Sequence, residues 1–246
     1  MSGPDTALPD TALVVDLWRG DAGGGGLVRY RVPVDPGQTI LDVLTWVQRH
    51  AEPGLAYRFA CRVGMCGSCA VMVNGVPRWA CRTRAIPVAR QGRLEIRPLR
   101  HFPVIRDLVV DFEAFFARWR RALGRFAPAS PPPDALAVIA PDAPDRQLVD
   151  AAIECIGCGI CLAACDSVGA NPDYLGPAAL NRAWAAVNDR RDDTKGHLRA
   201  AARDGGAHAC HAQGSCCRFC PVGRDPAGAI SGLKRHLVVA ALKGRL

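Results

Sequence analysis

The 246-residue sequence lacks the features that would carry a chain into or across a membrane. Its first residues, Met1–Thr11, are polar and contain proline, whereas a secretory signal peptide has a charged start followed by an apolar stretch. No apolar run reaches the ~20 residues that a bilayer-spanning helix needs. We therefore expect no signal peptide and no transmembrane segment, in a protein that is either free in solution or peripheral to a membrane.

Features of nucleic-acid binding and of a substrate site are equally scarce. The sequence has only three tyrosines and no nucleic-acid-binding motif, so its net charge of +8 does not predict a nucleic-acid partner. That charge fits either an anionic membrane surface or a basic surface without a specific task. We find no paired carboxylates and no nucleophile–base arrangement, so we expect no substrate site on this chain.

Cysteine is abundant, with twelve residues. Disulfide frameworks are typical of short secreted chains, whereas clustered Cys-x2-Cys spacings without a signal peptide favour metal ligation by thiolates in a reducing compartment. One run has the Cys-x2-Cys-x2-Cys-x3-Cys spacing of bacterial ferredoxins, at Cys155, Cys158, Cys161 and Cys165. A second run, residues 210–221, keeps that spacing but has Gln213 where the second cysteine belongs.

In two-cluster ferredoxins the fourth cysteine of each run binds the other cluster, and this crossing divides the cysteines into two sets. The first set has enough thiolates for a [4Fe-4S] cluster and consists of Cys155, Cys158, Cys161 and Cys220. The second set has one thiolate fewer, which predicts a [3Fe-4S] cluster, and consists of Cys165, Cys210 and Cys216. Cys217 is left over and is the alternative to Cys216 as a ligand.

A third cysteine group lies nearer the start of the chain. Its Cys-x4-Cys-x2-Cys loop and remote fourth cysteine have the plant-type [2Fe-2S] spacing, at Cys61, Cys66, Cys69 and Cys81. Gly64, Gly67 and Ser68 allow the loop to wrap tightly, so that backbone amides point at the sulfurs. Four thiolates also suit zinc, but a one-sided loop with a remote fourth cysteine fits an iron–sulfur cluster better.

The residues around this group predict a small ubiquitin-like sheet. Valine- and leucine-rich strands at 11–18 and 27–34 flank a glycine turn at 21–26. Thr39 and Asp42 form a capping box for a helix that runs to about His50. A second hairpin, 70–73 and 76–80, turns at Asn74-Gly75, and residues 93–99 alternate as a last strand.

The rest of the chain has helical periodicity, which makes the fold class α+β. Expected helices cover residues 108–123, 146–154, 176–189, 194–204 and 226–243. Residues 127–144 are rich in alanine and proline, so they are expected to be extended, as a linker or as an ordered strap. The change in composition divides the chain into a β-rich domain, 1–105, and an all-α domain, 106–246.

Several segments resemble the iron–sulfur subunit of succinate dehydrogenase and fumarate reductase. They are Tyr57–Cys69, Val73–Pro77, Arg106–Asp111, Asn171-Pro172 and Gly176–Ala179. The resemblance implies a β-grasp plant-type ferredoxin domain followed by an α-helical ferredoxin domain. It also implies a flavoprotein partner that carries FAD, a membrane anchor such as a cytochrome b, and quinone at the interface with that anchor.

In this family, electrons pass between flavin and quinone through [2Fe-2S], [4Fe-4S] and [3Fe-4S] clusters, on the cytoplasmic side of the inner membrane. The resemblance places Lys234 and His211 at quinone-site positions, whereas a solvated helix face and a packing role are their alternatives. Two departures stand out. Asp166 replaces a proline and would put a carboxylate near the three-iron cluster, where burial would disfavour reduction or keep the carboxylate protonated. Val168–Ala170 lacks a tryptophan of ubiquinone-linked relatives, which favours a fumarate reductase or menaquinone-linked type.

Two other functions remain open from the sequence. One is the iron–sulfur subunit of another flavin-dependent dehydrogenase, such as a thiol-dependent fumarate reductase. The other is a zinc-stabilised scaffold without redox activity.

Overall fold

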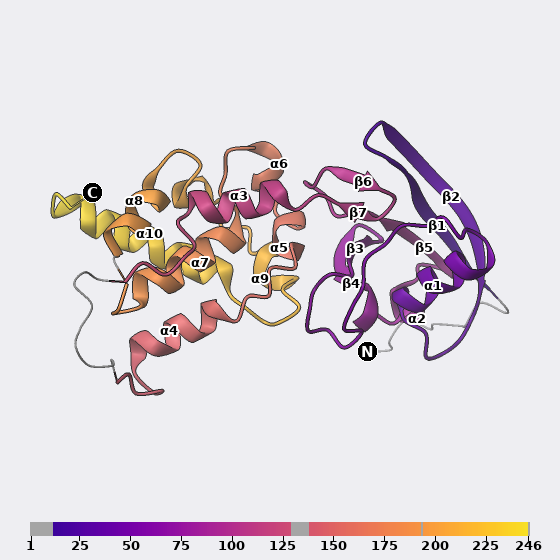
Figure 1. The fold of residues 1–246 in the computed structure, drawn as a ribbon, viewed down its shortest axis with the longest axis horizontal. Helices are drawn as coiled ribbons and strands as arrows, with labels where there is room; N and C mark the ends of the chain where they lie inside the picture. Colours follow the sequence, from indigo (N-terminus) through magenta and orange to yellow (C-terminus); the bar gives the residue numbers. More distant parts are fainter. Residues whose placement is uncertain (1–11, 129–137, 193, 246) are drawn as a thin grey trace, which may run out of the picture. The chain divides into compact units, whose positions relative to one another are not determined.

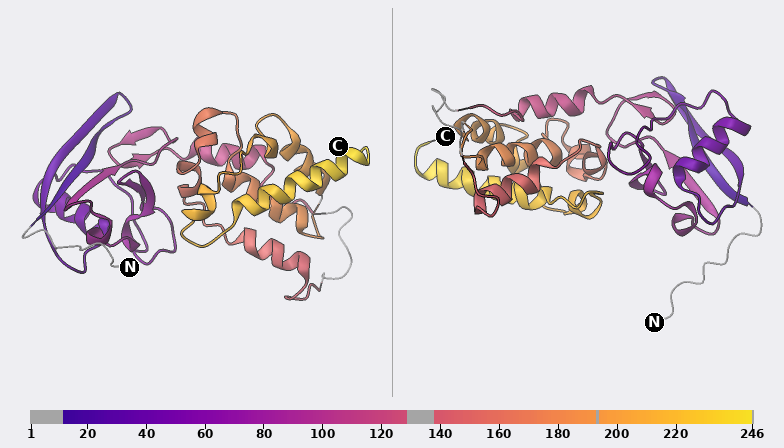
Figure 2. Two further views of the ribbon diagram at one scale, coloured as in Figure 1. Left: turned by 180° about the vertical axis from the view of Figure 1, so that it is seen from behind. Right: turned by 60° about the horizontal axis from the view of Figure 1, so that its bottom comes forward.

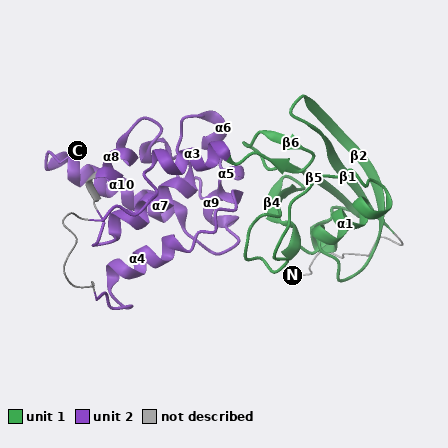
Figure 3. Ribbon diagram, in the orientation of Figure 1, with its two compact units in different colours: residues 1–112 green, residues 113–246 purple. Residues whose placement is uncertain are grey.

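The computed structural model describes residues 12–128, 138–192 and 194–245. The chain forms two compact units, residues 1–112 and 113–246 (Figure 3). Their boundary follows Phe112, whereas the composition of the sequence puts a boundary after residue 105. All the named strands belong to the first unit, and the described part of the second unit consists of helices and loops with one isolated β-bridge, so the predicted α+β class is confirmed.

The first unit is built on a seven-stranded sheet with the order β4-β3-β5-β1-β6-β7, in which β2 pairs with β1. Its strands are β1 (Ala12–Asp21), β2 (Gly24–Pro33), β3 (Ala70–Val73), β4 (Val76–Trp79), β5 (Arg93–Arg97), β6 (Val104–Arg106) and β7 (Val109–Val110). Strand β1 is the hub of the sheet, since it runs antiparallel to β2, parallel to β5, and meets β6 at its end. Figure 1 shows β1 and β2 as one long hairpin.

The β1–β2 hairpin is confirmed, but its turn is shorter than predicted. Only Ala22 and Gly23 separate the strands, and Gly24–Gly26 belong to β2, paired with the end of β1. The two backbones approach so closely there that a Cβ on Gly25 would lie 2.3 Å from the carbonyl oxygen of Arg19. The glycine run therefore permits close strand pairing rather than a flexible turn.

The helix α1 (Ile40–His50) follows the predicted capping box. The Thr39 hydroxyl accepts from the Asp42 backbone at 3.2 Å, and the Asp42 carboxylate accepts from the Thr39 backbone at 2.8 Å. Apolar residues at helical spacing then face inward, including the fully buried Val43 and Val47. They join the buried side chains of β1 and β5 in the core of this unit. The first unit also contains a 3-10 turn, η1 (Ala80–Arg82), and a short helix, α2 (Ala85–Val88).

The helix predicted over residues 108–123 starts later, at Glu113. Asp107 has a left-handed backbone, with φ +49°, and turns the chain so that Val109–Val110 becomes β7 and pairs with β6. A strand favours these two β-branched residues, and their apolar run does not belong to the amphipathic helix that follows. The prediction of one continuous helix was therefore wrong over its first turn.

The second unit is helical. Its elements are α3 (Glu113–Arg121), α4 (Pro144–Ile153), α5 (Ile160–Ala163), α6 (Asp166–Ala170), α7 (Pro177–Asn188), α8 (Thr194–Ala202), η2 (Ala207–Ala209), α9 (Ser215–Arg218) and α10 (Pro226–Leu242). Helix α7 packs against α3, α4, α8 and α10, as the views in Figure 2 allow the reader to follow. It is buried along most of its length, so it forms the core of this unit.

The four longer helices predicted after residue 144 are confirmed with small shifts at their ends. The short α5 and α9 inside the cysteine runs, and α6 directly after the first run, were not predicted. The predicted extended segment, 127–144, lies partly outside the described residues. At its described ends, Pro128 forms a β-bridge with Asp192, and α4 begins at Pro144. None of the described helices is long and apolar enough to cross a membrane.

Candidate functional site

The loop that holds the first cysteine group wraps around Cys61. The backbone amides of Met65 and Cys66 donate to the Cys61 sulfur at 3.2 and 3.3 Å. The loop needs left-handed backbone at Gly64, with φ +77°, where a Cβ would lie 2.9 Å from the Trp79 ring. A side chain at Gly64 would thus strain the backbone and strike the ring, which explains a glycine there. Amides aimed at sulfur suit an anionic iron–sulfur cluster.

The other two cysteines of this group flank the second hairpin, which has the predicted Asn74-Gly75 turn. Cys69 precedes β3 and Cys81 follows β4, and the amide of Ala80 donates to the Cys69 carbonyl at 3.1 Å. The hairpin pairing brings these two distant positions together. Both side chains are buried, whereas Cys66 on the loop is exposed.

The thiols of this group differ in how readily they ionise. Hydrogen bonds from the Cys61 backbone and from Ser68 lower the pKa of Cys66 to about 6. Burial, together with the adjacent thiol of Cys81, raises the pKa of Cys69 to about 12. A buried thiolate at Cys69 therefore requires a positive charge nearby, which the irons of a cluster would supply.

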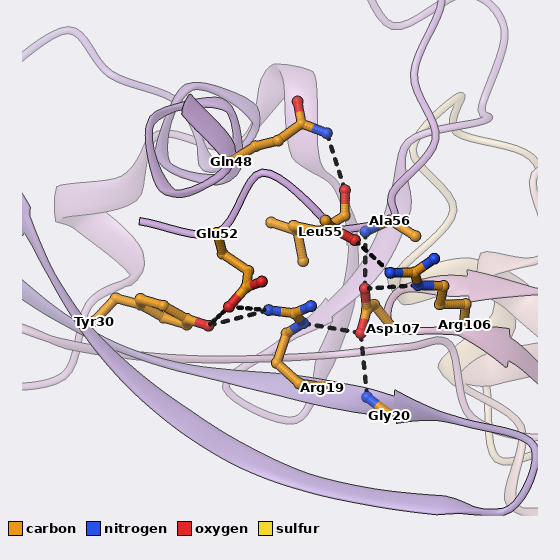
Figure 4. Close-up of polar contacts among 10 residues, drawn as sticks. Arg19, Gly20, Tyr30, Gln48, Glu52, Leu55, Ala56, Arg106 and Asp107 are labelled. Atoms are coloured by element: carbon orange, nitrogen blue, oxygen red, sulfur yellow. Dashed lines mark hydrogen bonds and ion pairs between the residues drawn. The ribbon is translucent and has the colours of Figure 1, made fainter. Parts of the chain in front are cut away.

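A carboxylate supports the start of this loop. Asp107 is 2 % exposed and accepts three hydrogen bonds: from the Arg19 guanidinium at 2.9 Å, the Gly20 amide at 3.1 Å and the Ala56 amide at 2.8 Å (Figure 4). Burial alone would raise the pKa of Asp107, but the hydrogen bonds from Arg19, Ala56 and Gly20 together lower it. Arg19 is also paired with Glu52 at 2.8 Å, so the network spans β1, the turn after α1 and the β6–β7 connection.

Two further contacts extend from this network toward the cysteine loop. The Leu108 amide donates to the Ala56 carbonyl at 3.1 Å, and the Arg58 guanidinium donates to the Val110 carbonyl at 3.0 Å. Residues 56–58 are therefore held just before Cys61. Segment 106–111 carries part of the family resemblance. In the structure, its residues Asp107 and Val110 support the start of the cysteine loop.

In the helical unit, a cavity is lined by all four cysteines predicted to act together, namely Cys155, Cys158, Cys161 and Cys220. Phe115, Asn181 and Arg224 are among its other lining residues. The Arg224 amide donates to the Cys220 sulfur at 3.2 Å, and the buried Asn181 side chain donates to the Ala152 carbonyl at 2.9 Å. The structure thus brings Cys220 of the second run to the first run.

Burial and crowding oppose ionisation of two of these thiols, Cys161 and Cys155. Burial, and then the neighbouring thiols of Cys158 and Cys155, raise the pKa of Cys161 well above its ordinary value. Burial also raises the pKa of Cys155, although the charges of Arg182 and Arg224 act in the opposite direction. A set of thiolates at this cavity therefore fits a cationic iron core, with the two arginines as additional positive charges.

The second set of cysteines also assembles from both runs. Burial and then the thiols of Cys217, Cys165 and Cys210 raise the pKa of Cys216, so each of these three thiols lies within electrostatic reach of Cys216. The Ala212 amide donates to the Cys210 sulfur at 3.4 Å. Gln213, which stands where a cysteine would complete the spacing, is exposed.

Cys217 has other partners than this set. Its thiol lies 2.9 Å from an Asp225 carboxylate oxygen and accepts from the Ala227 amide at 3.3 Å, so it faces the start of α10. The Cys216 and Cys217 sulfurs are 3.9 Å apart. The leftover cysteine therefore caps a helix start together with Asp225.

The structure places the remaining predicted site residues as follows. The Lys234 ammonium donates to the Cys210 carbonyl at 2.7 Å, and His211 is exposed. Asp166 is exposed at the first turn of α6, so the condition of burial, under which its carboxylate would disfavour reduction, is not met. The helix start turns its side chain to solvent, while Ser167 and Val168 take the buried positions.

All twelve cysteines are free thiols in the structure. Within the described ranges, no three His, Cys, Asp or Glu side chains converge closely enough to hold a single metal ion. Four thiols, those of Cys155, Cys158, Cys161 and Cys220, instead line one cavity, and the Arg224 amide donates to the Cys220 sulfur. This donor set fits a multi-atom iron–sulfur group.

Comparison with known proteins agrees with this geometry. Residues 15–117 match the family model described as "2Fe-2S iron-sulfur cluster binding domain", and residues 154–225 match "4Fe-4S dicluster domain". The chain is 37 % identical to the fumarate reductase iron-sulfur subunit of Haemophilus influenzae, over 88 % of this chain and 90 % of that protein. It is 34 % identical to the succinate dehydrogenase iron-sulfur subunit of Paracoccus denitrificans, over 96 % and 91 % of the two chains.

The chain belongs to the family of iron–sulfur subunits of succinate dehydrogenases and fumarate reductases. Its fold is similar to a chain in the structure described as "Mycobacterium smegmatis Sdh1 complex in the apo form", with TM-score 0.84 and 28 % identity over 95 % of this chain and 97 % of that chain. Like other members of this family, it is an electron-transfer subunit of an oxidoreductase complex, with [2Fe-2S]- and [4Fe-4S]-binding domains.

The sequence prediction missed the residues of this subunit that support the cysteines without being cysteines. Asp107 lies in a segment that carries the resemblance, Asn181 lies two residues after another, and Arg224 lies four residues after Cys220. Their side chains bond to distant parts of the chain, at Ala56, Ala152 and Ala151. Tyr174 lies between the Asn171-Pro172 and Gly176-Pro177 segments, and the sequence did not predict it as a site residue either. Their position near a motif or a cysteine was the only feature of the sequence that could have indicated a role for these four residues.

Proposed function

We propose that this subunit relays electrons between FAD of a flavoprotein subunit and quinone at a membrane anchor, through [2Fe-2S], [4Fe-4S] and [3Fe-4S] clusters in that order. The observation that carries the proposal is that Cys165, from the first run, and Cys210, from the second, both act electrostatically on Cys216, and that Cys210 acts on Cys165. Each of the two cysteine sets in the helical unit draws on both cysteine runs, one set with four thiols and the other with three. Together with the cysteine group around Cys61, they would provide three cluster sites.

The clusters would supply one-electron redox chemistry, and the protein's part is to hold and tune them. The ligands would be Cys61, Cys66, Cys69 and Cys81 for [2Fe-2S], Cys155, Cys158, Cys161 and Cys220 for [4Fe-4S], and Cys165, Cys210 and Cys216 for [3Fe-4S]. Amides that donate to the sulfurs of Cys61, Cys210 and Cys220 stabilise added negative charge at each of the three sites.

The absence of a fourth thiol supports three irons at the last centre. Gln213 offers an amide, a weak ligand compared with a thiolate, and its side chain is exposed. The Cys217 thiol interacts with Asp225 and the Ala227 amide at the start of α10, which favours Cys216 over Cys217 as the ligand.

The quinone end of the relay lies beside the three-cysteine set. Lys234 uses one of its three N–H donors on the Cys210 carbonyl, so two remain for a quinone oxygen, and exposed His211 adjoins the same cysteine. The complex would be peripheral on the cytoplasmic side of the inner membrane through an anchor subunit. Val168–Ala170, without tryptophan, favours a fumarate reductase or menaquinone-linked type, which the quinone extracted with the purified complex would identify.

Metal analysis and EPR of the purified complex test the cluster set. We expect about nine iron atoms per chain, a three-iron signal in the oxidised protein and a [2Fe-2S] signal after reduction. Stoichiometric zinc without iron would overturn the proposal.

Replacement of Gln213 by cysteine tests the incomplete corner. Because Gln213→Cys restores the Cys-x2-Cys spacing, we expect loss of most of the oxidised three-iron signal and a gain of about one iron per chain. Gln213→Ser is the matched control, which should keep the signal. An unchanged signal and iron content in Gln213→Cys would contradict the assignment of this corner.

A further inference from the structure

Tyr174 carries a buried hydroxyl that the fold leaves without a partner. Its side chain is 0 % exposed, and its hydroxyl makes no hydrogen bond with any described residue. A buried hydroxyl without a partner is destabilising, whereas a phenylalanine would fill the same space without that cost. The hydroxyl is therefore better explained by an acceptor that the polypeptide itself does not contain.

The groups that act on this hydroxyl are the thiols of the second cysteine set. Burial contributes most to raising the pKa of Tyr174, followed by Cys210 and then by Cys165 and Cys216. The phenol carries a single proton, so it can donate one hydrogen bond. A cluster held by these three cysteines would supply an acceptor for that proton.

The backbone on both sides of the ring is fixed. The Tyr174 amide donates to the Asn171 carbonyl at 3.1 Å, and the Arg118 guanidinium donates to the Tyr174 carbonyl at 3.1 Å. The next amide, of Leu175, donates to the Gly205 carbonyl at 2.7 Å. Gly205 has φ +73°, and a Cβ there would lie 2.2 Å from the Asp173 carbonyl oxygen, so this approach requires glycine. Such a fixed side chain is suited to positioning one donor accurately.

We propose that the Tyr174 hydroxyl donates a hydrogen bond to the three-iron centre, at a cluster sulfide or at the Cys210 sulfur, and thereby raises the reduction potential of that centre. The inference rests on the proposed function, because it requires a cluster at Cys165, Cys210 and Cys216. A donor strengthens its bond as the cluster gains an electron, so it favours the reduced state. Tyr174 is thus a positioning residue that tunes the cluster. The reduced state of the three-iron centre would be more stable with its hydroxyl than without it.

The variant Tyr174→Phe removes only the hydroxyl. In the purified complex, an EPR-monitored redox titration should show a negative shift of the three-iron midpoint potential, with the potentials of the other two clusters unchanged. An exchangeable proton coupled to the oxidised three-iron centre should disappear from the ENDOR spectrum. Tyr30→Phe is the matched control: its ring lies in the first unit, where its hydroxyl accepts from Arg19 at 3.2 Å, and it should leave both readouts as in wild type.

A measurement on the wild-type complex avoids any dependence on a variant that folds. Tyrosine deuterated at the ring carbons beside the hydroxyl should give a deuterium coupling to the three-iron centre in pulsed EPR. The absence of that coupling in the wild-type complex would overturn the inference while the three-iron centre stands. So would a Tyr174→Phe variant that keeps both the wild-type midpoint potential and the exchangeable proton. A wild-type complex that shows no three-iron signal at all would instead overturn the proposed function, and this inference with it.

Discussion

The two units hold their cysteines in different ways. In the sheet unit, the start of the Cys61 loop is supported by a buried carboxylate, Asp107, that gathers an arginine and two amides. In the helical unit, glycines with left-handed backbone precede single-turn helices, Gly159 before α5 and Gly214 before α9, with φ +78° and +76°. The charged support at Asp107 and the glycines that precede α5 and α9 should therefore respond differently to pH and to substitution.

The largest effect is expected from Asp107→Asn. Asparagine tolerates the left-handed backbone at this position, so the change removes charge and one strong acceptor without straining the chain. We expect the first unit to lose about 2 to 3 kcal/mol of stability at pH 7, because Arg19 and an amide lose their partner. Urea denaturation followed by circular dichroism measures it. Asp16→Asn, which affects only exposed pairs with Arg29 and Arg93, should cost under about 1 kcal/mol.

The same variant predicts a pH dependence. The folded-state pKa of Asp107 is lowered, so its contribution is fully present above the unfolded value of about 3.9 and is lost as pH falls through the folded-state pKa. The stability difference between wild type and Asp107→Asn should therefore be constant from pH 7 to about 5 and shrink below about pH 4. A difference that stays constant to lower pH would show that charge is not what supports this loop.

A comparable effect is expected from Gly176→Ala in the helical unit. Gly176 has φ +83° at the start of α7, and a Cβ there would lie 2.8 Å from a methyl carbon of Leu162 in α5. Left-handed strain and crowding add up to about 2 to 3 kcal/mol, independent of pH between 5 and 8. Thermal unfolding of the complex, with the visible absorbance of the clusters as a second readout, measures this loss.

The smallest effect is expected from Gly214→Ala. This glycine has a similar φ, +76°, but a Cβ there would meet no atom within 4 Å. Only the conformational cost remains, about 1 kcal/mol, so the pair Gly176→Ala and Gly214→Ala separates crowding from backbone strain. A Gly214→Ala variant as unstable as Gly176→Ala would contradict that separation.

The sequence predicted what depends on local pattern. Spacing grouped the cysteines, the Thr39–Asp42 box set the start of α1, and Asn74-Gly75 set the second hairpin. It failed where distant contacts decide: Val109 pairs in a strand because Asp107 is held by β1, and the glycines at 24–26 belong to a strand because β1 lies so close. The contacts of Asn181 and Arg224 could not be predicted either, since they exist only after folding.

The crossing of the two cysteine runs has a consequence for the unfolded chain. A cluster held at once by Cys161 and Cys220 closes residues 162–219 into a loop, much as a disulfide would. Loop-closure entropy for a ring of this length is worth about 4 kcal/mol, and a second cluster joining Cys165 to Cys210 would close a nested ring within it. Helices α7 and α8 lie inside both rings, so the inorganic cofactors would serve as cross-links that restrict the unfolded chain as well as carriers of electrons.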